Sequence, residues 1–319
     1  MAIDFAAIAP ELVLTITALV VLLVDLVLKG EAKQLANPIA AIGTIVAIVF
    51  TALLWGDDRT TFADSFVISP YAVVFKLVFL GALLAILGVS WRYFAESRFF
   101  QGEYYFLLLV SFLGMVIMPS ARDLLLLFVA LETVSVPAFV MAGLRKRDLY
   151  SSEAAIKFFL IGVLSVALML FGMSMIYGFT GTTNLTGIAE WIAANDTPPL
   201  LLASVLLVIV GFGFKVSAVP FHFWAPDTYA GSPMPVAAML AVASKAAGFA
   251  GLMAVTFIAF EPVADVWAPA MGVLAILTMT LGNLIALQQQ DIVRLLAYSS
   301  VAQAGYMLIP FGLAQSGNA

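Results

Sequence analysis

Ten apolar stretches follow one another along the chain, and each is long enough, or nearly so, to cross a lipid bilayer as a helix. A helix satisfies its own backbone hydrogen bonds in lipid, so the predicted fold class is an all-α polytopic membrane protein. With 10% charged residues, the chain lies far below the roughly one quarter of a soluble domain. The predicted spans are residues 10–28, 38–54, 71–89, 104–118, 122–143, 152–177, 198–219, 234–258, 268–287 and 291–313.

Positive charges between these stretches predict the orientation of the chain. With strict alternation, eight Lys and Arg residues fall on one side and two, Arg59 and Arg122, on the other. Since cytoplasmic loops carry the excess of Lys and Arg, the N-terminus is predicted to lie on the outer side. The connection 178–197 is expected to form a short interfacial helix anchored by Trp191. The eight inner residues are Lys29, Lys33, Arg92, Arg98, Arg145, Lys146, Arg147 and Arg294.

Several classes of site are excluded by residue types that are missing or rare. The chain has no cysteine, which removes thiolate-held iron–sulfur clusters and cysteine zinc sites. Its single histidine cannot supply two axial haem ligands, and no glycine-rich phosphate loop follows a strand pattern. We therefore expect no cofactor-binding site, no metal site and no nucleic-acid partner in this chain.

Four lysines fall inside the predicted spans, where a charge costs about 2.5–3.5 kcal/mol even on insertion scales. Lys76 lies about five residues from the end of its span, so its ammonium is expected to snorkel to the outer interface. Lys157 follows Glu153 by four residues, the favourable spacing for a helical ion pair. Structural pairing and a functional role both remain open for Lys157.

Two charges lie near the centres of their spans. Glu132 is about ten residues from either end, or roughly 15 Å deep at 1.5 Å per residue, and Pro137 is expected to bend the helix beside it. Lys245 is surrounded by Ala, Ser and Gly, which leave room for a close helix or for water. Neither position allows snorkelling, so both residues are predicted to be functional.

The stretch FGFKVSAVPFHFWAPD places Lys215 five residues before Pro220, with His222, the only histidine, just after it. Proline breaks a helix, and broken helices in membranes line cavities and build ion sites. His222 can relay protons near neutral pH; the alternative is a capping or packing role. One carboxylate, two central lysines and a histidine suit proton transfer better than metal binding or nucleophilic catalysis.

Four longer stretches resemble one family. They are LFVALETVSVPAFVMAGL, SSEAAIKFFLIGVLSVALMLFGMSMIYGFTGTTNL, GFKVSAVPFHFWAPDTYAGSPMPVAAMLAVASKAAG and DIVRLLAYSSVAQAGYML. Together they are similar to the subunit N family of bacterial respiratory complex I, an antiporter-like membrane subunit of NADH:quinone oxidoreductase. The resemblance runs from about residue 10 to the end of the chain.

The resemblance implies roles for five residues. Glu132 and Lys215 are expected to form an ion pair, Lys245 to be the central lysine, Lys157 to lie along the same path, and His222 to lie in the broken region. The family has about fourteen helices in an inverted repeat, and its missing part would hold a further lysine. Residues 1–319 would thus be one transmembrane domain from a truncated chain or fragment. Its parts are helices 1–3 (1–103), a first repeat (104–258) and the incomplete start of a second (268–319).

The resemblance also implies a function. The chain is expected to be a proton-translocating subunit without a redox centre, with NADH, FMN, iron–sulfur clusters and quinone bound by other subunits. Expected partners are the lipid bilayer and other complex I membrane subunits, especially neighbouring antiporter-like ones. The expected location is the bacterial inner membrane, with a periplasmic N-terminus. The alternatives are a subunit of a multisubunit cation/proton antiporter and a purely structural membrane subunit.

Overall fold

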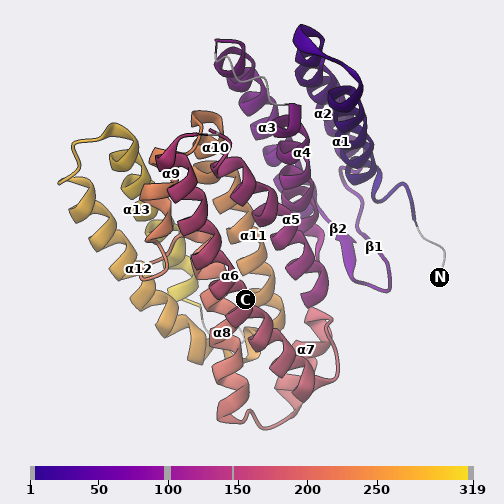
Figure 1. Cartoon of the computed structure of the whole chain (residues 1–319). Helices are drawn as coiled ribbons and strands as arrows, with labels where there is room; N and C mark the ends of the chain where they lie inside the picture. The colour runs from indigo at the N-terminus through magenta and orange to yellow at the C-terminus, as the bar shows by residue number, and fades with distance from the viewer. Residues whose placement is uncertain (1–3, 97–101, 146, 315–319) are drawn as a thin grey trace.

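The computed structural model describes residues 4–96, 102–145 and 147–314, and Arg98 and Lys146 lie outside this described part. Within it, ten helical segments are long and apolar enough to cross a membrane, and they form a bundle (Figure 1). All ten predicted spans are confirmed, with ends that differ by a few residues. The segments are α1 (Ala9–Val27), α2 (Ala36–Leu53), α3 (Pro70–Glu96), α4 (Gly102–Ile117), α5 (Leu124–Ala142), α6 (Leu149–Thr180), α8 (Pro199–Val216), the run Met234–Ala259, α12 (Ala264–Ala286) and α13 (Ile292–Gly312).

Side chains just before several helices explain where these helices begin. Asp123 accepts hydrogen bonds from the backbone N–H groups of Leu125 and Leu126 at the start of α5. Asp148 and Asp291 do the same at the starts of α6 and α13. The first N–H groups of a helix have no partner within the helix, and such a cap satisfies them. The short polar connections of the sequence therefore fix the helix ends.

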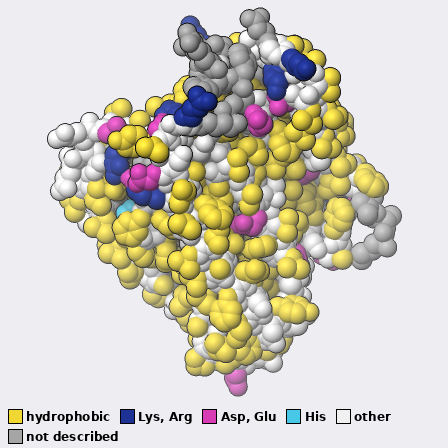
Figure 2. Space-filling model, in the orientation of Figure 1, with side chains coloured by type: hydrophobic (Ala, Val, Ile, Leu, Met, Phe, Trp, Pro, Cys, Tyr) yellow, Lys and Arg dark blue, Asp and Glu magenta, His cyan; other side chains and the backbone are white. Residues whose placement is uncertain are grey.

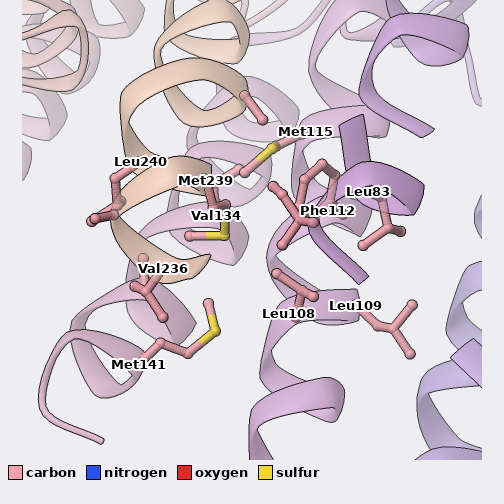
Figure 3. Packing of buried hydrophobic residues seen from close by; sticks show 14 of the residues in the cluster. Leu83, Leu108, Leu109, Phe112, Met115, Val134, Met141, Val236, Met239 and Leu240 are labelled. Carbon is pink, nitrogen blue, oxygen red and sulfur yellow. The ribbon is translucent and has the colours of Figure 1, made fainter. Parts of the chain in front are cut away.

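The interior of the bundle is packed with apolar side chains contributed by neighbouring helices. Figure 3 shows one such region, where Phe112 and Met115 of α4 lie near Val134 of α5 and Met239 of α10 (Met234–Met239). The outer surface is also apolar, and on the face shown the Lys and Arg side chains gather towards one end (Figure 2). Apolar side chains both in the interior and on the outer surface are the pattern expected of a protein in lipid.

Three connections at one end of the bundle join through backbone hydrogen bonds. Strands β1 (Arg59–Thr61) and β2 (Phe66–Ile68) form a small antiparallel hairpin, which the all-α prediction did not include. The N–H of Arg122 donates to the carbonyl of Ser65 at 2.8 Å. The expected short helix in the connection 178–197 is present as α7 (Leu185–Ala194), and its Trp191 is half-buried against the bundle.

The seventh span is broken, as predicted. Helix α8 ends at Val216, Ser217 adopts a left-handed conformation with φ 60°, and α9 (Trp224–Gly231) begins after a turn. The N–H of Val219 donates to the Thr278 hydroxyl on α12 at 2.9 Å. The Trp224 indole N–H donates to the carbonyl of Phe214 at 3.1 Å. These bonds satisfy groups that the break exposes, as a non-helical backbone inside a membrane requires.

Candidate functional site

Lys215 lies at the end of α8, buried with 3% of its surface exposed. Its Nζ donates to the hydroxyl of Ser135 on α5 at 3.0 Å. Gly248 makes room for the lysine stem, since a Cβ there would lie 2.9 Å from Lys215 Cγ. Gly248 is one of the small residues near Lys245, and here it allows its helix to approach α8 closely beside Lys215, as the sequence predicted for these residues. Lys215 is thus held by packing and by one hydroxyl.

Glu132 lies on α5, three residues before Ser135, and its buried Oε1 has no hydrogen-bond partner within residues 4–96, 102–145 and 147–314. The direct ion pair expected between Glu132 and Lys215 is not formed, because the ammonium instead donates to Ser135, one turn along the same helix. Among the described residues, no cation lies within 4.0 Å of the Glu132 carboxylate. The two charges remain within electrostatic reach of each other. The sequence did not single out Ser135.

Lys245 is the first residue of α11 (Lys245–Ala254) and follows a π-helical turn, η3 (Leu240–Ser244). Only 5% of its surface is exposed. Its Nζ donates to the hydroxyl of Ser300 on α13 at 2.8 Å and lies 6.0 Å from the ring centre of Tyr229 on α9. Single π turns inside helices often mark functional sites. A neutral hydroxyl and an aromatic ring thus surround this ammonium.

His222 lies in the connection 217–223 between α8 and α9, outside the spanning segments. It is buried, and its Nδ1 has no hydrogen-bond partner in the part of the chain that the structure describes. Burial lowers the pKa of His222, the backbone at Pro220 opposes this shift, and the charge of Lys245 adds to it. The imidazole is therefore neutral at pH 7 and has a nitrogen free to take a proton. Both the relay and the packing interpretation agree with this placement.

Lys157 on α6 belongs to a cluster of charged side chains at the end of the bundle. Its Nζ lies 2.7 Å from Glu153, which confirms the helical ion pair expected from the spacing. It also lies 2.7 Å from Asp227 on α9, whose second oxygen lies 2.8 Å from Arg294 on α13. The sequence interpretation missed Asp227, although it is the only acidic residue between Asp196 and Glu261.

Asp227 also faces a polar pocket of about 410 Å³ between α6, α9 and α13. Burial alone would raise the pKa of the Asp227 carboxyl, but the hydrogen bonds and charges of Lys157 and Arg294 outweigh it, and the pKa is lowered. The carboxylate is therefore ionised throughout the neutral range.

Among the described residues, no three His, Cys, Asp or Glu side chains lie close enough together to hold a metal ion.

Lys76 departs from its predicted position. Its ammonium was expected to reach the outer interface, but the side chain on α3 is only 1% exposed. Its Nζ lies 2.7 Å from the carboxylate of Glu11 on α1 and 4.7 Å from the ring centre of Phe66. The buried carboxylate holds the cation inside, because neither charge can leave without stranding the other. Spacing along the sequence could not show this pair, since its members lie on different helices.

Residues 121–319 match a family described as "NADH:quinone oxidoreductase/Mrp antiporter, TM". NADH-quinone oxidoreductase subunit N 2 of Streptomyces griseus is 45% identical over 98% of the chain and 61% of its own length. F(420)H(2) dehydrogenase subunit N of Methanosarcina mazei is 42% identical over 96% of the chain and 63% of its own length. The chain spans about three fifths of the length of these curated relatives.

Two solved structures share the fold. A chain of respiratory complex I from Thermus thermophilus with bound aureothin is 35% identical, with a TM-score of 0.80 over 95% of this chain and 64% of that one. A chain of the membrane-bound sulfane sulfur reductase, an archaeal respiratory membrane complex, is 22% identical, with a TM-score of 0.82 over 97% of this chain and 65% of that one. The second likeness concerns the fold alone.

Proposed function

The chain belongs to the NADH:quinone oxidoreductase/Mrp antiporter transmembrane family, and from this premise we propose that it is a proton-translocating membrane subunit of complex I. In this proposal, electrons pass from NADH to quinone in other subunits, which bind FMN and the iron–sulfur clusters. This chain supplies no redox centre and moves protons through Glu132, Lys215, Lys245, His222 and Lys157. It would work in the bacterial inner membrane beside other antiporter-like subunits, with its N-terminus in the periplasm.

One observation carries the proposal: Lys215 and Lys245 are buried within the bundle, and their hydrogen bonds to other described residues go only to serine hydroxyls. A buried ammonium without a carboxylate partner is costly, and losing its proton removes that cost. Ser135 donates its hydroxyl proton to the carbonyl of Leu131 and Ser300 donates its own to the carbonyl of Ala297. Each hydroxyl oxygen can therefore accept a hydrogen bond from the ammonium or from an N–H of the neutral amine. Both charge states of each lysine can therefore be accommodated, as proton transfer requires.

Glu132 complements the lysines in this scheme. Its carboxylate lies near Lys215 without touching it, so a small movement would make or break the ion pair and change the charge that Lys215 favours. A change in the quinone-reducing part of the complex could bias that movement. The chain would then couple distant electron transfer to proton release without handling electrons itself.

The test is substitution of the three central residues in the intact complex, reconstituted into lipid vesicles. Glu132→Gln, Lys215→Met and Lys245→Ala should each lower proton pumping at least tenfold and reduce quinone reductase activity, while the complex still assembles. A control is Asp196→Asn, an exposed position beyond α7. Normal pumping by the Lys245→Ala complex would overturn the proposal.

The family description also covers Mrp antiporters, so a subunit of a multisubunit cation/proton antiporter is the second candidate. The two functions differ in what drives the protons. Vesicles in which a sodium or potassium gradient alone moves protons, without an electron donor or quinone, would favour the antiporter. Proton movement that requires electron transfer would favour the respiratory complex.

A further inference from the structure

Asp227 occupies a position that the proposed proton path does not use. It is the fourth residue of α9, the short helix that resumes after the break, and α9 packs against both α6 and α13. Figure 1 shows these three helices together, and Figure 2 shows basic and acidic side chains side by side in that region. Asp227 is therefore placed where three elements of the bundle meet.

The two carboxylate oxygens of Asp227 bind two cations from different helices. Oδ2 accepts a hydrogen bond from Lys157 on α6 at 2.7 Å, and Oδ1 accepts one from Arg294 on α13 at 2.8 Å. Charge-assisted bonds of this kind are about twice as strong as neutral ones. If the carboxylate were absent, two cations would face one pocket without their shared anion. We call this arrangement, formed by Lys157, Asp227 and Arg294, the Asp227 clamp.

The clamp is linked by short chain segments to the central lysine. Tyr229, two residues after Asp227 on α9, has its ring 6.0 Å from Lys245 Nζ. Ser300, six residues after Arg294 on α13, accepts the hydrogen bond of the same ammonium at 2.8 Å. Six residues of helix span only about 9 Å. The clamp thus fixes the two helices that hold the surroundings of Lys245.

We propose that Asp227 is a positioning residue, which holds α9 and α13 on one carboxylate and thereby sets the geometry between the polar pocket and Lys245. Lys157, proposed above as a station on the path, then also anchors α6 to the clamp. This inference rests on the proposed function, because its effect is measured as proton pumping.

The clamp also has a defined pH dependence. The pKa of Asp227 is lowered by its two cations, so the clamp is complete above the ordinary Asp pKa of about 4 and is lost only as the pH falls through the lowered value. The other titratable groups that line its pocket are Tyr150 and Glu153 from α6 and Asp291, which directly precedes α13. At neutral pH, protonation of Asp227 therefore does not open the clamp.

The experiment compares four complexes in vesicles, with pumping expressed per assembled complex: wild type, Asp227→Asn, Asp227→Glu and Asp227→Asn with Arg294→Gln. Asp227→Asn should lower pumping about tenfold and move the alkaline limb of its pH profile to lower pH. The reason is that removal of a negative charge disfavours protonation of nearby groups. Asp227→Glu should restore most of the activity, and Arg294→Gln should restore part of the loss in Asp227→Asn.

Wild-type pumping and pH profile in Asp227→Asn would overturn the inference, and so would a double variant no better than Asp227→Asn. If Asp227→Asn assembles poorly, the double variant and Asp227→Glu decide the matter, since neither leaves Arg294 facing an uncharged amide. Glu132→Gln serves as the reference. If it pumps normally, the proposed function itself fails. If it is inactive while Asp227→Asn is unaffected, only the role of Asp227 fails.

Discussion

Lys76 and Lys245 are both buried in the bundle, with 1% and 5% of their surfaces exposed, but their partners differ. Lys76 is paired with the carboxylate of Glu11 at 2.7 Å. Lys245 donates to the hydroxyl of Ser300 at 2.8 Å, and the residue facing it is an aromatic ring. The first lysine has a full opposite charge beside it, whereas no carboxylate among the described residues lies within 4.0 Å of the second.

This difference distinguishes Lys76, whose charge has a structural role, from Lys245, whose protonation state can change. A buried pair of full charges stabilises the protonated lysine and the ionised carboxylate together, because removing either one would leave the other buried and unpaired. A lysine among hydroxyls gains little from remaining charged and can release its proton at lower cost. Burial by itself therefore does not distinguish a lysine of the proposed proton path from a structural one; the charge of its partner does.

The largest expected effect tests this distinction through folding stability. Lys76→Met leaves the Glu11 carboxylate buried and unpaired, which should lower the free energy of unfolding by about 3–5 kcal/mol. Lys245→Met leaves no carboxylate behind, and Ser300 keeps its bond to the carbonyl of Ala297. Its free energy of unfolding should stay within about 1 kcal/mol of wild type, although pumping is lost. Unfolding in mixed detergent micelles measures both.

The double variant Glu11→Gln with Lys76→Met is the control for this prediction. It removes both charges, so it should recover most of the stability lost in Lys76→Met. Equal destabilisation by Lys76→Met and Lys245→Met would contradict the distinction between the two lysines.

A smaller effect is expected from the hydroxyl beside Lys245. Ser300→Ala removes the hydrogen-bond acceptor of the ammonium, and a bond to a charged group is worth about 1.5–3 kcal/mol. Pumping should fall about three- to tenfold, measured in vesicles as proton uptake for each quinone reduced. Ser300→Thr keeps a hydroxyl and should pump nearly as well as wild type. If Ser300→Ala pumped normally, the hydroxyl would have no part in holding Lys245.

The smallest effect is expected at His222. Its Nδ1 has no partner among the described residues and could pass a proton on, but a water molecule could do the same. His222→Gln keeps a polar side chain but cannot take up a proton, so pumping should fall about two- to threefold, because water can carry part of the transfer in its place. His222→Phe preserves the ring without any polar atom and distinguishes packing from relay. Full activity in His222→Phe would assign the ring to packing.

The fold was largely accessible from the sequence, because long apolar stretches and the proline at 220 report directly on spans and on a break. The importance of Glu132 and Lys245 could be predicted for a related reason: a charge in the middle of a span cannot be explained by snorkelling to the membrane surface. What could not be predicted were partners that lie on other helices. Ser135 and Ser300 are ordinary residues in sequence, and only packing brings them to the lysines.

The prediction that Lys76 snorkels was wrong for the same reason, because its partner lies on another helix. Distance to the helix end suggested snorkelling, but the first turn of α1 supplies a carboxylate that the sequence could not connect to α3. Asp227 offered a signal that could have been used, because it is an isolated acid in a long stretch without any other. A lone carboxylate next to a predicted helix break is a reason to look for cations on distant helices.

Different kinds of bond hold the chain together at the two ends of the bundle, and this difference bears on the back-flow of protons. At the end that carries β1 and β2, backbone bonds link three connections: Arg122 N–H to the Ser65 carbonyl, Leu124 N–H to Thr183, and Leu185 N–H to Arg122. At the opposite end, the Asp227 clamp joins helices through side chains alone. Side-chain ion pairs rearrange without unfolding, whereas a backbone layer does not. A protein that admits protons at one end while keeping the other closed to back-flow would need this asymmetry.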